Sequence, residues 1–206
     1  MALSQQQLRD NNVQFDSVIN KLNEINRDAF MVRYPFAACF DDNGEDHILT
    51  KILFVNYLDS TQIKNINIPT LQNYISSVLI EGDFVVLHQG IFDEHGKLND
   101  RYFDIVNNIA IGHGIIGAGN RNEDNLTSFA SKFCGHHNQN SPFWDNQVSV
   151  FVKYLNYRHR YRNYREYVES IIALRNDYNL VDYSLREIEY AMWEITDDVI
   201  NGRFLN

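Results

Sequence analysis

The sequence contains little proline, glycine or cysteine for its length. It has 3 prolines and 10 glycines in 206 residues, which argues against a linker-rich or disordered chain. Two cysteines, Cys39 and Cys134, are too few for a disulfide framework, so we expect a reducing, cytoplasmic setting. The N-terminus lacks the basic head and apolar run of a signal peptide, and no apolar stretch is long enough to cross a bilayer. We therefore expect a cytoplasmic protein with no membrane partner.

The composition supports a folded core, and the charge is unevenly distributed. Hydrophobic residues make up 44% of the chain and aromatic residues 13%, enough for one or two compact domains. The net charge of −9 counts against a protein that coats nucleic acid non-specifically. However, residues 153–167 carry five basic side chains and one acidic side chain, a net charge of +4 that leaves −13 for the rest. This basic stretch could bind phosphate locally.

Apolar residues recur at helical spacing along most of the chain, and no long run alternates between apolar and polar residues. Ser184 and Glu187 form the pattern of a capping box, and Asp83 could cap a short helix that follows it. We expect one all-α domain with two lobes over residues 1–206. The predicted helices span about 3–26, 47–57, 68–82, 84–89, 102–110, 126–136, 146–156, 161–178 and 184–200.

Asp145 is the most informative candidate site residue. It follows Pro142, Phe143 and Trp144 and precedes an apolar helical run. A lone carboxylate between aromatic residues could stabilise a cationic, sugar-like transition state or activate a water molecule. Asp145 could also be the N-cap of its helix. The two roles are compatible, and both remain open on the sequence alone.

Two other motifs are weaker candidates for a metal site and a phosphate site. Cys134, His136 and His137 resemble metal ligands, but their side chains diverge and no second pair has zinc-like spacing, so we expect no metal. The glycine-rich passage 112–119 lacks the ending of a P-loop. The amides of a tight turn at Gly117 and Gly119 could instead meet a phosphate.

Tyrosines and arginines form two stripes near the basic stretch. The tyrosines recur at helical spacing, and the arginines include Arg158 and Arg162. One interpretation is a core-facing tyrosine edge with a solvated basic face. The other is a nucleic-acid surface on which arginines hold phosphates and tyrosines pack against sugar or base. The stripes comprise Tyr154, Tyr157, Tyr161 and Tyr164, and Arg158, Arg162 and Arg165.

Three motifs together resemble the helix-hairpin-helix DNA glycosylase superfamily. Ser60–Ile63 is similar to the motif whose polar side chain fills the gap left by an extruded base, a role that falls on Gln62. Ile115–Gly119 is similar to the hairpin of the superfamily, and Pro142–Val148 to its catalytic aspartate segment. The order and rough spacing agree over residues 46–160. Residues 129–148 also resemble a divergent branch of uncharacterised bacterial proteins.

The resemblance implies a DNA N-glycosylase that flips a nucleotide out of the helix into a pocket between its two lobes. Asp145 would stabilise the developing positive charge on the deoxyribose and orient or deprotonate the attacking water. Phe143 and Trp144 would line the pocket. The remaining implied DNA-binding or substrate-binding residues are Gln62, Gly117, Gly119, Lys132, His136, His137, Arg158 and Arg162.

Departures from the superfamily pattern narrow this prediction. The hairpin connection is lengthened by residues 120–125, and the lysine of bifunctional members has no counterpart, because Lys132 lies too far along its helix. The iron–sulfur cysteines are absent as well. We therefore expect a monofunctional enzyme without a cofactor that acts on a damaged or modified base, including the modified bases of phage DNA. The alternative is a non-catalytic helical module that binds DNA or protein.

Overall fold

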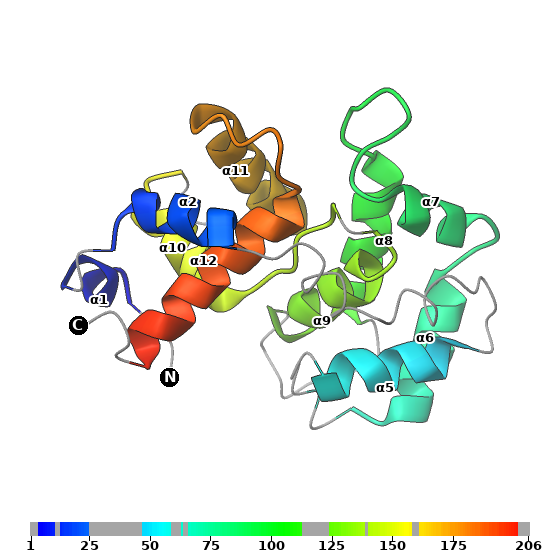
Figure 1. The fold of residues 1–206 in the computed structure, drawn as a ribbon. Helices are drawn as coiled ribbons and strands as arrows, with labels where there is room; N and C mark the ends of the chain where they lie inside the picture. The colour runs from blue at the N-terminus through cyan, green and yellow to red at the C-terminus, as the bar shows by residue number, and fades with distance from the viewer. Residues whose placement is uncertain are drawn as a thin grey trace. The chain divides into compact units, whose positions relative to one another are not determined.

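The computed structural model describes residues 4–10, 13–24, 47–58, 63, 66–112, 124–138, 140–157 and 161–201. These residues form helices and contain no strand, apart from an isolated bridge between Phe92 and Leu98 (Figure 1). The predicted all-α class is therefore confirmed. Within these ranges, no helix is both long and apolar enough to cross a membrane.

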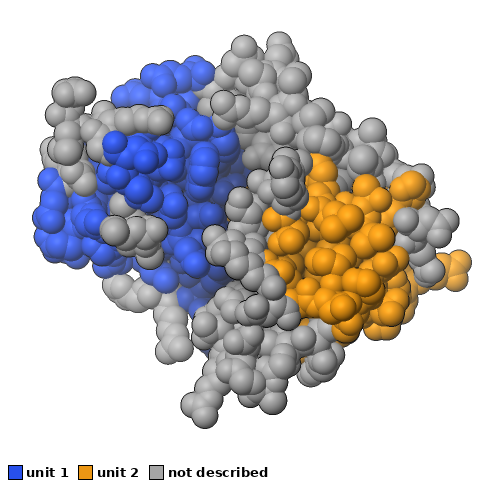
Figure 2. Space-filling model, turned by 90° about the horizontal axis from the view of Figure 1, so that it is seen from below, with its two compact units in different colours: residues 1–34, 144–206 blue, residues 35–143 orange. Residues whose placement is uncertain are grey.

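The chain divides into two compact units, coloured separately in Figure 2. Unit 1 comprises residues 1–34 and 144–206, and unit 2 comprises residues 35–143. The helices of unit 1 are α1 (Gln5–Asp10), α2 (Phe15–Glu24), α10 (Asn146–Tyr154), α11 (Tyr164–Asp177) and α12 (Leu185–Ile200). The helices of unit 2 are α5 (Ile48–Leu58), α6 (Ile68–Val78), α7 (Asp83–Gln89), α8 (Asp100–Ile111) and α9 (Asp124–Gly135).

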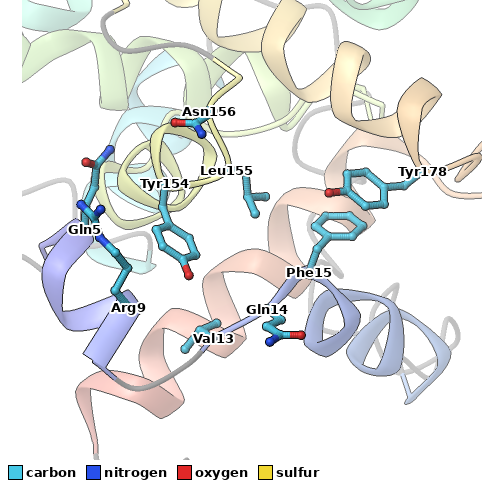
Figure 3. A pocket seen from close by; sticks show the side chains of 9 residues that line it. All are labelled: Gln5, Arg9, Val13, Gln14, Phe15, Tyr154, Leu155, Asn156 and Tyr178. Atoms are coloured by element: carbon cyan, nitrogen blue, oxygen red, sulfur yellow. The ribbon is translucent and has the colours of Figure 1, made fainter.

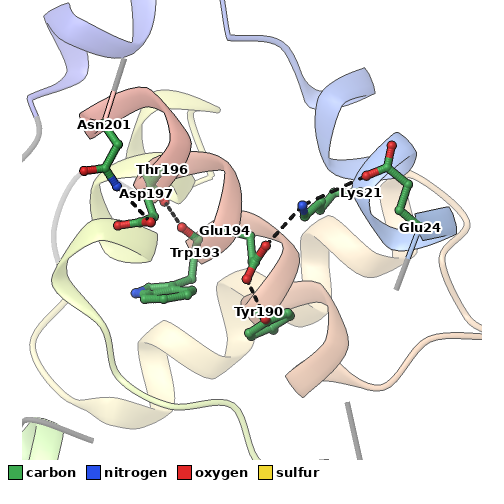
Figure 4. A network of polar contacts seen from close by, with 8 residues as sticks. All are labelled: Lys21, Glu24, Tyr190, Trp193, Glu194, Thr196, Asp197 and Asn201. Atoms are coloured by element: carbon green, nitrogen blue, oxygen red, sulfur yellow. Dashed lines mark hydrogen bonds and ion pairs between the residues drawn. The ribbon is translucent and has the colours of Figure 1, made fainter. Parts of the chain in front are cut away.

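Helix α12 is the central element of unit 1, because it packs against α2, α10 and α11. Its apolar side is fully or almost fully buried, as the spacing of Ile188, Met192 and Ile195 predicts. The Lys21 ammonium on α2 lies 3.1 Å from the Glu194 carboxylate on α12 (Figure 4). This ion pair therefore links two helices that are distant in sequence.

Helix α8 has the corresponding role in unit 2, where it packs against α6, α7 and α9. Tyr102, Val106 and Ile109 on α8 are fully buried. Asn99 caps this helix by accepting a hydrogen bond from the Tyr102 amide, and Gly112 ends it with a left-handed conformation (φ 57°). Local capping and an apolar stripe thus define the helix that the sequence predicts here.

Several predicted boundaries are confirmed and two are wrong. Ser184 and Glu187 form the predicted capping box at α12. The apolar pattern predicted over 3–26 is divided between α1 and α2, and Val13 and Gln14 lie between them outside any helix. Asp83 does not cap α7, because Gly82 occupies the N-cap position with φ 90°. The Asp83 side chain points back to the Ile80 amide instead.

Candidate active site at the start of helix α10

Asp145 is the N-cap of α10, as one of the two interpretations predicted. Its backbone is extended (φ −123°, ψ 134°), which lets the side chain turn back onto the first helical turn. Oδ1 accepts hydrogen bonds from the Gln147 amide at 2.7 Å and the Val148 amide at 3.4 Å. Oδ2 accepts no hydrogen bond from any described residue. Half of this carboxylate is thus engaged by the fold, and the half-buried side chain retains an available oxygen atom.

Three aromatic rings, which we call the aromatic triad, lie next to Asp145 in sequence or in space. The triad consists of Trp144, Tyr161 and Tyr167. The ring centroids are 5.1 Å apart for Trp144 and Tyr167, 5.8 Å for Trp144 and Tyr161, and 5.6 Å for the two tyrosines. Tilted and edge-to-face contacts at these distances stabilise aromatic clusters. The triad therefore holds the segment before α10 against α11.

The pKa of Tyr167 is shifted by its burial and by nearby carboxylates. Its side chain is fully buried, and its hydroxyl has no hydrogen-bond partner among the described residues. Burial raises the pKa of Tyr167 well above its usual value, and the negative charges of Glu189 and Asp145 raise it further. The phenol consequently stays protonated, and two carboxylates lie near enough to act on it.

Lys153 is a cation that lies over one ring of the aromatic triad. Its Nζ lies 5.3 Å from the centroid of the Tyr161 ring. Partial burial lowers the pKa of Lys153. The start of α10 and its surroundings thus combine a carboxylate, a protonated phenol and a partly desolvated ammonium within unit 1.

Three predicted site residues of unit 2 pack within an aromatic cluster, namely His136, His137 and Phe143. His136 lies 4.9 Å from the Phe143 ring, measured between centroids, and Phe143 is buried. His137 is also buried and lies 5.1 Å from His88. Lys132 is half-buried in the last turn of α9. The structure therefore brings His136 and Phe143 together, and a role for these residues in base or phosphate binding stays a prediction.

Cys134 lies on the buried side of α9. Its side chain is fully buried, and this burial raises the pKa of the thiol far above its usual value, with a further contribution from the Asp83 charge. A thiol in this environment is a poor nucleophile. No group of three or more histidine, cysteine, aspartate or glutamate side chains in the described part of the chain is arranged to hold a metal ion.

The predicted tyrosine and arginine stripes do not share one helix. Helix α10 ends at Tyr154, and α11 begins at Tyr164, so the two tyrosines at the ends of the stripe lie on different helices. Tyr161 and Arg162 lie between these helices. Arg162 is exposed, and its Nε donates to Glu166 Oε1 at 2.6 Å. This contact raises the pKa of Arg162. The structure thus has two helices where the sequence predicts two, at 146–156 and 161–178, and the interpretation of the stripes as a nucleic-acid surface stays a prediction.

Four predicted site residues lie outside the described residues. They are Gln62, Gly117, Gly119 and Arg158. Their roles stay predictions.

Sequence reasoning missed two residues near Asp145. Tyr167 lies on α11 and Glu189 on α12, so neither shares a local motif with Asp145. The packing of α12 against α10 and α11 brings these helices together. The available signal was Glu189, a charged residue within the apolar stretch of α12 that proves to be buried. Charged residues are rarely buried without a functional or structural reason.

Comparisons with known proteins define the family of this chain. Residues 15–141 match the HI_0787_N family, which is described as an N-terminal domain. A protein of Haemophilus influenzae named "Uncharacterized protein" is 28% identical over 156 residues, covering 69% of this chain and 71% of the relative. No solved structure matches the chain significantly. The family match ends four residues before Asp145 and covers more than half of the sequence. The chain belongs to the HI_0787_N family.

Proposed function

We propose that this protein is a monofunctional DNA N-glycosylase of the helix-hairpin-helix type, which removes a damaged or modified base and leaves an abasic site. The observation that carries the proposal is the state of Asp145. One oxygen of its carboxylate is fixed by two backbone amides, and the other accepts no hydrogen bond from a described residue. A rigidly positioned carboxylate with an available oxygen is suited to electrostatic and general-base catalysis.

In the proposed reaction, the bond between C1′ of the deoxyribose and the base nitrogen breaks first. The bonding electrons leave with the base, and positive charge develops on the sugar. The Asp145 carboxylate stabilises that charge, as carboxylates do in sugar hydrolysis. Asp145 Oδ2 then accepts a proton from water as the water oxygen bonds to C1′. The departing base then takes up the proton that Asp145 accepted from water, so the products are the free base and an abasic deoxyribose, and the carboxylate is regenerated.

The remaining roles follow from the superfamily resemblance and are part of the same proposal. Gln62 fills the gap that the flipped nucleotide leaves, and the turn at Gly117 and Gly119 holds a DNA phosphate through its amides. The lack of a lysine at the bifunctional position supports hydrolysis without strand cleavage. Lys132, in the last turn of α9, contacts base or phosphate.

The experiment is an assay for abasic sites on DNA duplexes and single strands that carry a panel of lesions and phage-type modifications. We expect the wild-type protein to release at least one base. Asp145→Asn should lose this activity, because asparagine preserves the helix cap but removes the negative charge. Asp104→Asn is the matched control, since Asp104 is an exposed carboxylate on α8. Equal activity of Asp145→Asn and wild type would contradict the proposed mechanism.

A second candidate function is a non-catalytic module that binds DNA or protein. The net charge of −9 favours it, because an acidic surface is suited to a protein partner. This alternative predicts that binding survives Asp145→Ala and that no base is released from any member of the panel. DNA binding by such a module would weaken with salt and depend on Arg158 and Arg162.

A further inference from the structure

Unit 1 contains a pocket at the other end of α10 from Asp145. The pocket has a volume of about 490 Å³ and lies between α1, the start of α2, the end of α10 and the C-cap of α11 (Figure 3). This volume is typical of sites for small molecules. Asp145 and Tyr154 are nine residues apart, which places them roughly 14 Å apart along a helix. The pocket is therefore a separate site from the start of α10.

The electrostatics of the pocket differ from those of the whole chain. Among the described residues that line the pocket, Arg9 is the only charged one, whereas the chain has a net charge of −9. The Arg9 side chain is exposed and forms no ion pair or hydrogen bond with any residue that the structure describes. A guanidinium without a carboxylate beside it is well suited to an anionic group such as a phosphate.

Amide side chains add hydrogen-bonding capacity to the pocket, and of these Gln5 lies beside Arg9 in Figure 3. The pocket is lined by Gln5 on α1, by Gln14 just before α2 and by Asn156 just after α10. None of these amide groups is engaged by another described side chain or backbone group. Each can donate and accept, which matches the mixed donors and acceptors on the edge of a nucleobase.

Aromatic and apolar side chains form the remaining wall. Phe15 and Tyr178 stack with their ring centroids 3.7 Å apart, opposite Gln5 and Arg9 in Figure 3. Leu155 lies between these two sides. The pocket thus has a cationic group at Arg9, a flat aromatic surface opposite it, and the three amide side chains distributed among its lining residues.

Asn156 is held in a conformation that supports this arrangement. Its φ is 65°, in the left-handed region that non-glycine residues rarely adopt. The backbone N–H of Asn156 donates a hydrogen bond to the backbone carbonyl oxygen of Lys153 at 3.0 Å, which fixes the turn after α10. Glycine would adopt this backbone without strain, so an asparagine here retains a side chain at the pocket.

We propose that this pocket binds a nucleoside monophosphate, with the phosphate on Arg9, the base edge on the amides, and the face of the base against Leu155 and the aromatic stack. The same chemistry is offered by a free nucleotide and by the 5′-phosphorylated end of a DNA strand. Binding at this pocket does not depend on base excision, because Asp145 and the aromatic triad are not among its lining residues.

The test is calorimetric titration of the full chain with AMP, adenosine and ribose 5-phosphate. AMP should bind, and each of the two fragments should bind at least tenfold more weakly. Arg9→Gln should weaken AMP binding about tenfold and leave adenosine binding unchanged, because a charge-assisted hydrogen bond is lost. Lys97→Gln, which removes an exposed cation in unit 2, should leave both affinities unchanged.

A second pair of variants tests the contribution of the Asn156 side-chain amide to AMP binding. Asn156→Gly should weaken AMP binding several-fold without lowering stability. Asn179→Gly is the matched control, since Asn179 also has a positive φ (54°) but does not line the pocket. Absence of AMP binding at millimolar concentration, or equal effects of Arg9→Gln and Lys97→Gln, would overturn the proposal. A 5′-phosphorylated oligonucleotide that binds at least tenfold more tightly than AMP would identify the DNA end as the ligand, and comparable affinities would identify the free nucleotide.

Discussion

Two aspartates near the starts of helices have opposite relations to the fold. Asp145 at α10 accepts two backbone hydrogen bonds on one oxygen and is half-buried. Asp83 at α7 is 2% exposed, and both of its oxygens are used. Oδ1 accepts from Arg101 Nε at 2.9 Å, and Oδ2 accepts from Arg101 Nη2 at 2.8 Å and from the Ile80 amide at 2.9 Å.

The difference shows which carboxylate is available for chemistry. A buried carboxylate whose oxygens are all engaged stabilises structure, and losing its partner is strongly destabilising. A cap that uses one oxygen leaves the other for a substrate or a water molecule. We therefore assign a structural role to Asp83 and propose a chemical role for Asp145.

The largest expected effect is on catalysis at Asp145. Asp145→Asn should lower the single-turnover rate of base release by about 10²- to 10³-fold, the loss typical of removing one electrostatic stabiliser. Its free energy of unfolding should stay within about 0.5 kcal/mol of wild type, because asparagine is an equally good cap. Rapid-quench kinetics and urea unfolding measure the two quantities. If Asp145→Asn lost stability together with the rate, Asp145 would have a structural role like that of Asp83.

The next effect is on stability at Asp83. Arg101→Gln should reduce the free energy of unfolding by about 3 kcal/mol, because it leaves a buried carboxylate without its cation. Arg101→Lys keeps the charge but loses the two-pronged contact, so it should lie between Arg101→Gln and wild type. Urea unfolding at neutral pH measures both variants. A change below 0.5 kcal/mol for Arg101→Gln would show that Asp83 is not fixed in this way.

The third prediction concerns the pH dependence of stability, to which the buried Cys134 thiol near Asp83 should contribute. Burial and the Asp83 charge raise the pKa of Cys134, so the folded state keeps the proton that the unfolded state loses near pH 8.5. The free energy of unfolding is therefore unaffected by Cys134 below that pH. It decreases as the pH rises, because only the unfolded state gains stability by releasing the thiol proton. Between pH 7.5 and 9.5 we expect a loss of about 1 kcal/mol that is absent in Cys134→Ala. Equal pH slopes for the two proteins would contradict this assignment.

Removing the cap itself should have an effect of similar size. Asp145→Ala should destabilise the protein by about 1 kcal/mol, because two amides at the start of α10 lose their acceptor. Asn67→Ala removes the cap of α6 and should cost a similar amount without changing base release. Thermal or urea unfolding of both variants gives the comparison. If Asp145→Ala proved as stable as wild type, the cap would not fix the carboxylate.

The smallest effect concerns the hydroxyl near Asp145. Tyr167→Phe removes a buried hydroxyl that has no hydrogen-bond partner among the described residues. Stability should be unchanged or should rise by up to about 1 kcal/mol, since no hydrogen bond is lost. Tyr164→Phe gives a neighbouring comparison on the same helix. A loss above 1 kcal/mol for Tyr167→Phe would show that its hydroxyl is engaged in the fold.

The sequence predicts the helices of this protein well where local signals are strong. The capping box of Ser184 and Glu187 and the cap at Asp145 both depend on residues that are close in sequence. Asp83 was assigned wrongly because its choice between a cap and an ion pair depends on Arg101, 18 residues away. Local patterns do not encode such long-range partners.

The candidate site was predictable in part for the same reason. Asp145 and Trp144 were recognised from adjacent residues, whereas Tyr167 and Glu189 reach this region only through the packing of α11 and α12. The tyrosine spacing continues in the sequence beyond Tyr154, where α10 ends, so the first and last tyrosines of the stripe lie on different helices. Periodicity alone does not show where a helix stops when flanking residues share the same pattern.

The most direct test of the central claim is mass spectrometry of free bases after purified protein is incubated with DNA that carries lesions and phage-type modifications. We expect wild type to release a defined base, and we expect Asp145→Asn, although equally stable, to release none. Release of no base from any member of the panel, or equal release by the two proteins, would contradict the claim that the available oxygen of Asp145 is catalytic.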